Sequence, residues 1–191
     1  MTFLILGILI FLGTHCFTIA RGPRAGAIAA IGEQGYKAAY SVLSLIGFVL
    51  LVWGFGQYRA EGMIPLWTPP TWGRHVAMLL MLFAFIALAA SAKLPSRIRG
   101  WLRHPMLVGI KLWALAHLLS NGDLGSVLLF GSFLAWAVVD RIAVKRRGDL
   151  GGERLDHFTR ADAITLVSGV VVYTLMLFAH GWLIGVSVMR G

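Results

Sequence analysis

The sequence contains little charge and almost no cysteine. Only 13% of its 191 residues are Asp, Glu, Lys or Arg, and Cys16 is the single cysteine. Soluble globular domains have about a quarter of their residues charged, so this composition argues against an ordinary soluble domain. A single cysteine excludes an internal disulfide. Because Cys16 lies in an apolar run, we expect it to be a small, buried, apolar side chain.

The chain also lacks the sequence motifs of several common sites. It contains no CxxCH motif, which excludes covalent c-type haem attachment. It contains no HExxH motif, Cys–His cluster or carboxylate–histidine spacing typical of zinc enzymes. Glycine-rich nucleotide-binding loops and Ser–His–Asp arrangements are absent as well. The apolar N-terminal run has no positively charged region before it, so we interpret it as a retained membrane span rather than a cleaved signal peptide.

Long apolar runs make up most of the sequence. Hydrophobic residues account for 58% of the chain, and most runs approach the ~20 residues that a helix needs to cross ~30 Å of hydrocarbon. The runs are too long for barrel strands and show no alternation of apolar and polar residues. We therefore predict an all-α, polytopic transmembrane helical bundle that forms a single integral membrane domain over residues 1–191. The six predicted spans cover residues 2–20, 36–58, 71–92, 104–119, 124–144 and 162–188.

The positive charges are distributed unevenly between the two sides of the predicted bundle. The formal net charge is +9, and most of the 17 Lys and Arg residues fall in loops on one side, including the glycine-rich, basic connection at 21–35. Only Arg59, Arg74 and Arg190 fall on the opposite side. The positive-inside bias predicts a multi-pass protein of a bacterial-type inner membrane with both termini outside. Contact with anionic lipid explains the charge without nucleic acid.

Histidines occur inside the apolar runs more often than helix packing requires. Six are present, and His157 alone falls in a loop. A neutral imidazole in lipid must satisfy both ring nitrogens, by hydrogen bonds or by a metal, and ionisable residues in spans are functional candidates. The five histidines in or at the edge of spans are His15, His75, His104, His117 and His180.

His15 and His117 are both predicted to lie in the middle of the bilayer, within about two helical turns of each other. Each lies roughly 18 Å from one end of its span, and the two spans run in opposite directions. Two histidines on facing helices could hold haem b non-covalently between them, so both are candidate metal ligands. The alternative is that each imidazole only forms hydrogen bonds between helices. His75 and His180 both fall near the outer boundary, where they could form a second pair of metal ligands or a hydrogen-bonded cluster.

The stretch that contains His117 carries further polar residues. Arg103, His104 and Pro105 form a charged corner, typical of a helix that begins with proline in its first turn. Arg103 could bind an anionic group such as a propionate or a phosphate. Lys111 lies on a different face of the helix from His117. We expect Lys111 to extend toward the cytoplasmic headgroups, or alternatively to contact a substrate or a haem propionate.

These residues resemble the NnrU family of membrane proteins. The matching segments are Gly13-Thr14-His15, Tyr36, RHPMLVG at Arg103–Gly109 and LWALAHLLSNGD at Leu112–Asp123. The family is similar to the plastid zeta-carotene isomerase, which uses haem b with two axial histidines to isomerise a cis double bond in a redox-dependent way. The resemblance implies axial ligands at His15 and His117. It also places that enzyme's RHP histidine on His104, and it finds histidines in similar contexts at His75 and His180.

The resemblance implies two possible activities, and two other functions remain as alternatives. We expect a redox-linked cis–trans isomerase of an apolar polyene, or a haem protein that binds nitric oxide in denitrification, the process with which NnrU proteins are otherwise associated. The first alternative is a non-catalytic membrane partner in the assembly or regulation of a denitrification complex. A weaker likeness to isoprenylcysteine carboxyl methyltransferases rests on the RHP corner, but KRRGDLGGERLDHF at 145–158 lacks the tyrosines of that family's cofactor pocket. Expected partners are the lipid bilayer, an apolar substrate or nitric oxide, and further copies of the chain, but no nucleic acid.

Overall fold

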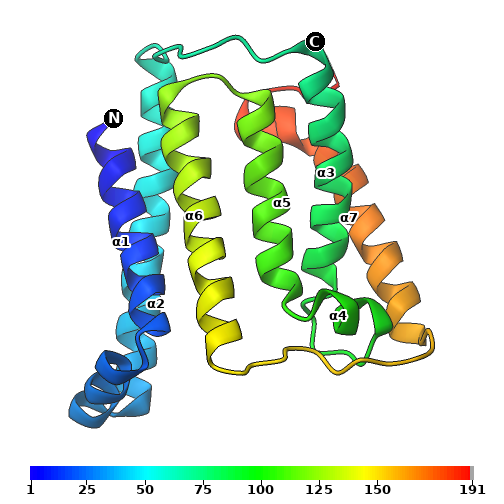
Figure 1. Cartoon of the computed structure of the whole chain (residues 1–191). Helices are drawn as coiled ribbons and strands as arrows, with labels where there is room; N and C mark the ends of the chain where they lie inside the picture. The colour runs from blue at the N-terminus through cyan, green and yellow to red at the C-terminus, as the bar shows by residue number, and fades with distance from the viewer. Residues whose placement is uncertain (190–191) are drawn as a thin grey trace. The chain divides into compact units, whose positions relative to one another are not determined.

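Helices make up nearly all of the regular structure in the computed structural model, which describes residues 1–189. No strand occurs in that range, where Pro65 and Asp123 form an isolated bridge. The predicted all-α class is therefore confirmed. Arg190, assigned above to the side with few positive charges, lies outside the described residues. The helices are α1 (Thr2–Ile19), α2 (Arg21–Ala60), α3 (Thr71–Ala89), α4 (Arg97–Leu102), α5 (Pro105–Ser120), α6 (Leu124–Arg146) and α7 (Arg160–Ile184) (Figure 1).

Five of the described helices are long and apolar enough to cross a membrane, namely α1, α2, α3, α6 and α7. The predicted fourth span corresponds to α5, which has 16 residues. At 1.5 Å per residue this helix is about 24 Å long, shorter than a ~30 Å hydrocarbon core. The prediction of a multi-pass helical membrane protein is confirmed, although the long spans are one fewer than the six predicted.

Two segments that were predicted as connections contain helix. Segment 21–35 belongs to α2, which begins at Arg21, directly after Ala20, and has 40 residues. Gly32 interrupts that helix with φ 74° and ψ 164°, a conformation that glycine adopts without steric cost. The prediction of a loop was wrong. It rested on the glycines and arginines of segment 21–35, which are typical of loops, but only Gly32 departs from helical geometry there. The six-residue helix α4 was also not predicted.

The described chain divides into two compact units, the first of which contains Met1–Pro69 and Asn121–Ala143. Within this unit α1 and α2 pack side by side (Figure 1). Their close approach depends on glycine, because a Cβ atom on Gly47 would lie 2.6 Å from the backbone nitrogen of Phe11. Small residues let membrane helices approach in this way. The other glycines that face the backbone of the opposite helix are Gly7 and Gly54.

A non-helical segment after α2 is attached to the start of α6 within the first unit. The backbone N–H of Leu124 donates to the carbonyl of Ile64 at 2.9 Å. The buried Asp123 carboxylate accepts hydrogen bonds from the backbone N–H and the hydroxyl of Ser126, at 2.9 and 2.6 Å. These bonds cap α6 and hold its first turn against segment 62–70.

The second unit contains Pro70–Ser120 and the chain from Val144 onward. Within it α3 packs against both α5 and α7 (Figure 1). Glycine again allows the contact, because a Cβ atom on Gly109 of α5 would lie 2.7 Å from the Leu88 side chain of α3. Gly169 of α7 faces the backbone of α3 in the same manner. Tight helix packing therefore positions the histidines that α5 and α7 carry.

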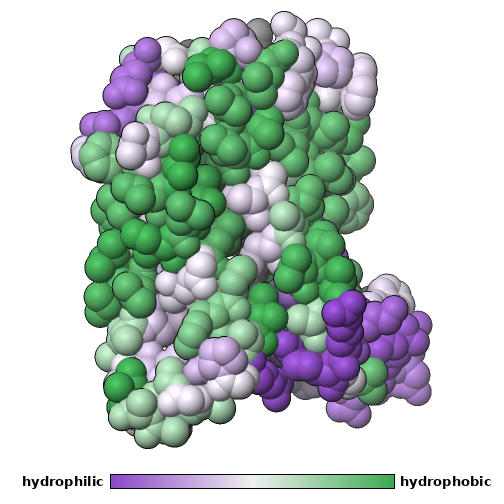
Figure 2. All heavy atoms as spheres, turned by 60° about the vertical axis from the view of Figure 1, so that its left-hand side comes forward, coloured by the Kyte–Doolittle hydropathy of each residue, from purple (hydrophilic) through white to green (hydrophobic). Residues whose placement is uncertain are grey.

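Apolar side chains cover the helix flanks, and hydrophilic side chains gather at helix ends (Figure 2). Leu45 of α2 and Val167 and Leu175 of α7 are each 62% exposed. Water-soluble proteins rarely leave so many large apolar side chains uncovered, whereas a bilayer solvates them. The chain is therefore suited to a lipid bilayer. Cys16 belongs to this exposed apolar surface and is not buried as predicted, because its flank of α1 is left uncovered within the unit.

Candidate histidine site

His15 lies on α1 in the first unit, half-buried among aromatic rings. Its ring centroid is 4.2 Å from that of Phe11, 5.5 Å from that of Tyr40 and 5.7 Å from that of Trp136. The Trp136 ring meets the imidazole edge-on, at an interplanar angle of 89°. These rings hold the imidazole in an apolar environment.

The hydrogen bond of His15 determines which ring nitrogen carries the proton. Nδ1 lies 2.7 Å from the carbonyl oxygen of Phe11, about one helical turn earlier. A carbonyl can only accept, so Nδ1–H is the donor, and Nε2 of the neutral ring carries the lone pair. Metal-bound histidines generally have this arrangement, because a hydrogen bond at one nitrogen orients the ring and raises the basicity of the other.

His117 on α5, in the second unit, has the same arrangement. Its Nδ1 lies 2.8 Å from the carbonyl oxygen of Trp113, so Nε2 again carries the lone pair. The Trp113 ring is close by, with 5.3 Å between the two ring centroids. His15 and His117 are therefore the same tautomer, each oriented by the carbonyl four residues earlier. Because they belong to different units, their predicted pairing stays a prediction.

His180 on α7 lies beside His117 in the second unit. Their ring centroids are 6.5 Å apart, and the ring planes are inclined by 32°. Gly185 caps α7 in the left-handed conformation, with φ 78°, and the next carbonyl, that of Val186, accepts from His180 Nδ1 at 2.7 Å. Sequence reasoning grouped His180 with His75 instead. His75 is exposed near the start of α3, and its pairing with His180 stays a prediction.

The Arg103–His104–Pro105 corner attaches a loop to the start of α5. Arg103 has a φ of 59°, and its carbonyl accepts the N–H of Gly152 at 2.9 Å. His104 Nε2 donates to the carbonyl of Asp149 at 3.1 Å, so its proton is on the opposite nitrogen from that in the two histidines described above. Pro105 is the first residue of α5, as predicted. The binding of a cofactor or an anion by this corner stays a prediction.

Asp162 has a structural role that sequence reasoning missed. Its carboxylate is 2% exposed and accepts the backbone N–H of Ile98 at 2.8 Å and that of Arg97 at 3.1 Å. It also accepts the backbone N–H of Thr159 at 2.8 Å, so one side chain caps both α4 and α7. The Thr159–Asp162 spacing is a local capping-box pattern for α7, but no local pattern could reveal the cap of α4, because the bond to Ile98 joins residues 64 positions apart.

Segment 147–159 is attached to α4 through an arginine that contacts two aromatic rings. The guanidinium carbon of Arg97 lies 4.8 Å from the ring centroid of Trp101 and 5.0 Å from that of Phe158. Cation–π contacts of this kind contribute roughly 0.5–2 kcal/mol. In the exposed part of the segment, a hydrogen bond from the His157 side chain lowers the pKa of the Asp156 carboxyl. The segment is therefore an ordered part of the second unit.

The number of metal-ligating side chains that lie together bears on which kinds of metal site the described residues can form. Across residues 1–189, no group of three or more His, Cys, Asp or Glu side chains could hold a metal ion. A zinc site generally needs three or four protein ligands, whereas a haem iron needs one or two axial ligands. Lys111 lies half-buried on α5, and its contact with headgroups, a substrate or a propionate stays a prediction.

Long helices with exposed apolar flanks define the chain as a multi-pass membrane protein. A comparison with known families refines this class. The family model described as NnrU protein matches residues 3–188, so the chain belongs to the NnrU family, as its RHP and LWALAH segments predicted. No curated protein and no solved structure matches the chain.

Proposed function

We propose that this protein binds haem b non-covalently, and that His15 and His117 are the residues that would hold its iron. The shared tautomer carries the proposal, because each Nδ1–H donates to a carbonyl and each Nε2 is therefore the unprotonated nitrogen of its ring. An axial ligand must supply such a lone pair, and the carbonyl hydrogen bond keeps the ring orientation fixed. His180 is the alternative partner of His117, because its Nε2 presents a lone pair in the same way.

The surroundings of His15 fit a large apolar group that carries a polar edge. Phe11 and Tyr40 offer ring surface beside the imidazole. Nε1 of Trp136 is buried and has no hydrogen-bond partner within residues 1–189. An unpaired buried N–H costs roughly 1–3 kcal/mol. An acceptor atom on a bound group would remove that cost, which supports a ligand on this side of His15.

Haem b bound there would supply an iron for the redox-gated isomerisation of a cis double bond in an apolar polyene, or for the binding of nitric oxide. The residues of the chain provide the setting for that chemistry. The carbonyls of Phe11 and Trp113 orient the two imidazoles, and the aromatic rings around His15 exclude water. An apolar polyene suits this environment, because ligand sites are lined mostly by apolar and aromatic side chains with few polar groups.

We also infer that the protein resides in an inner, cytoplasmic-type membrane with both termini outside. Lys and Arg are in excess in the segments that join α3 to α5 and α6 to α7, and the positive-inside bias favours the cytoplasm for those segments. Single cysteines introduced at Lys93 and at Arg59 test this orientation in a Cys16→Ser background. A membrane-impermeant thiol reagent added to intact spheroplasts should label only the cysteine at position 59, and the reverse pattern would contradict the orientation.

The haem content of the purified full-length protein tests the proposed function. A pyridine haemochrome assay should give about one haem b per chain for the wild type, because one iron takes both axial ligands. The variants His15→Ala and His117→Ala should lose most of it. His157→Ala is the matched control, since His157 is exposed in segment 147–159, and it should retain the haem. A folded wild-type protein without haem would contradict the proposal and favour the non-catalytic membrane partner.

A further inference from the structure

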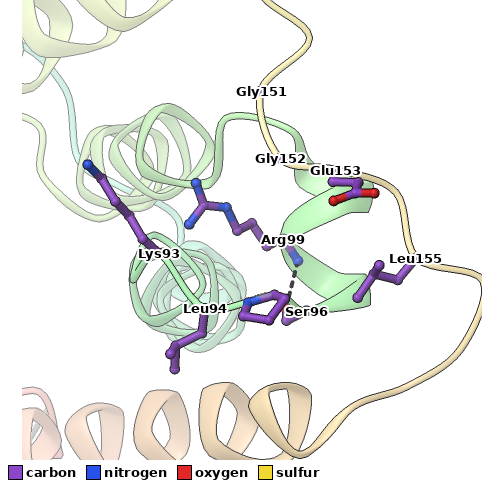
Figure 3. Close-up of a pocket in the computed structure, with 9 residues that line it drawn as sticks. Lys93, Leu94, Ser96, Arg99, Gly151, Gly152, Glu153 and Leu155 are labelled. Carbon is purple, nitrogen blue, oxygen red and sulfur yellow. Dashed lines mark hydrogen bonds between the residues drawn. The ribbon is translucent and has the colours of Figure 1, made fainter.

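A pocket of about 240 Å³ lies in the second unit, beside the chain that joins α3 to α4. Lys93 and Arg99 line it from that side, and Gly151, Gly152 and Glu153 line it from segment 147–159 (Figure 3). None of these residues belongs to the histidine site. The pocket therefore needs an explanation of its own.

The two cationic side chains of the pocket, Lys93 and Arg99, form no ion pair among residues 1–189, although Glu153 also lines the pocket. Their head groups lie toward the same side in Figure 3, with the Glu153 carboxylate on the opposite side of Arg99. Arg99 Nη1 donates to the Ala92 carbonyl at 2.8 Å, which holds the guanidinium in place and leaves its other N–H groups to face a ligand. The pocket is thus suited to an anion.

The position of the pocket matches the level of lipid headgroups. Lys93 follows closely on Ala89, the last residue of the long apolar helix α3. Leu94, which also lines the pocket, is 43% exposed, and Trp101 on α4 is 53% exposed. Cationic side chains next to exposed aliphatic and Trp side chains at a helix end are typical of the membrane interface, where phosphates are abundant.

The walls of the pocket are held in place before any ligand binds. Ser96 is 3% exposed, and its hydroxyl oxygen accepts the backbone N–H of Arg99 at 3.0 Å. The Thr159 hydroxyl donates to the Pro95 carbonyl at 2.9 Å and so joins the two sides of this region. A preformed pocket binds more tightly than a mobile one, because less conformational entropy is lost on binding.

We propose that Lys93 and Arg99 bind a phosphate group in this pocket. The guanidinium of an arginine donates paired hydrogen bonds to phosphate oxygens, and a lysine ammonium adds a point charge. A volume of about 240 Å³ is below the ~300–1,000 Å³ of pockets that hold drug-sized ligands, which suits a lipid headgroup or a small phosphate ester. Both sources present the same chemistry, and the site is independent of the haem proposal.

Native mass spectrometry of the full-length protein in detergent tests this site. The probe is dioleoyl phosphatidylglycerol, measured as the dissociation constant of the first bound lipid, with dioleoyl phosphatidylcholine for comparison. The wild type should prefer phosphatidylglycerol. Glycerol 3-phosphate is then added as a soluble competitor. If glycerol 3-phosphate displaces the lipid, a soluble phosphate ester is a ligand of the site. If it does not, the ligand is the headgroup of a lipid. Both results support the phosphate site.

Charge-changing variants locate the binding. Lys93→Gln and Arg99→Gln should each weaken the first lipid about fivefold, since a basic residue near a membrane surface is worth ~1 kcal/mol. Glu153→Gln should strengthen it by a similar factor, a gain that misfolding cannot produce. Arg154→Gln is the control, because Arg154 is exposed in the same segment but does not line the pocket. If Lys93→Gln and Glu153→Gln both behave like Arg154→Gln, the proposed site is overturned.

Discussion

The imidazole rings of His117 on α5 and His180 on α7 lie with their centroids 6.5 Å apart, and Nδ1 of each is bonded to a backbone carbonyl. Two neutral imidazoles in this state present lone pairs at Nε2, so they cannot donate a hydrogen bond to each other through those atoms. A metal ion, or a group that donates to both nitrogens, could join them. The haem proposal therefore has a specific competitor, in which His180 rather than His15 completes the ligand pair.

The variant His180→Ala separates the two ligand pairs. With His15 and His117 as ligands, this variant should retain its haem and the low-spin electron paramagnetic resonance signal of bis-histidine ligation, because both axial nitrogens remain. His15→Ala should lose that signal. The opposite result, loss in His180→Ala and retention in His15→Ala, would assign the iron to His117 and His180.

Substitution of Gly47 tests the close packing of α1 on α2. A Cβ atom at this position would lie 2.6 Å from the Phe11 backbone nitrogen, so Gly47→Ala should lower the free energy of unfolding by about 1–3 kcal/mol. Gly56→Ala is the control on the same helix, because a Cβ atom there meets nothing within 4 Å. Thermal unfolding in detergent, followed by circular dichroism, measures both. Equal melting temperatures for the two variants would contradict the packing account.

Substitution of Asp162 tests the double cap of α4 and α7. Asp162→Ala leaves the backbone N–H groups of Arg97 and Ile98 without their acceptor, so it should cost about 2–4 kcal/mol of unfolding free energy. Asp156→Ala removes a carboxylate that is exposed in the adjoining segment, and its melting temperature should match that of the wild type. Hydrogen exchange at Ile98 gives a second readout, because its amide should lose protection in Asp162→Ala alone. Retained protection would show that another group caps α4.

The membrane spans could be predicted from sequence because hydropathy and length are local properties of a helix in lipid. The start of α5 at Pro105 followed equally from local rules, since proline lacks the N–H that the first turn leaves unbonded. By contrast, segment 21–35 was predicted as a loop although α2 begins at Arg21. Composition could not show that the helix begins at Arg21 and that only Gly32 departs from helical geometry inside it.

Contacts between helices could not be predicted, because they depend on which helices become neighbours. Gly47 and Gly54 are seven residues apart and share a face of α2, but no local pattern identifies Gly7 of α1 as part of the same contact. The contact of His117 with His180 likewise requires that α3 packs against both α5 and α7. Depth along each helix was predictable, and it placed His15 and His117 as candidates, but lateral neighbours come only from the packed structure.

The absorption spectrum of the purified full-length protein, recorded oxidised and reduced, shows directly whether His15 and His117 hold haem b. The account predicts a Soret band in the wild type and a sharp α band on reduction, as expected for an iron held by two imidazoles. His15→Ala and His117→Ala should each lose that low-spin spectrum, while His157→Ala keeps it. A folded wild-type protein with no Soret band, or a low-spin spectrum that is unchanged in both His15→Ala and His117→Ala, would contradict the account.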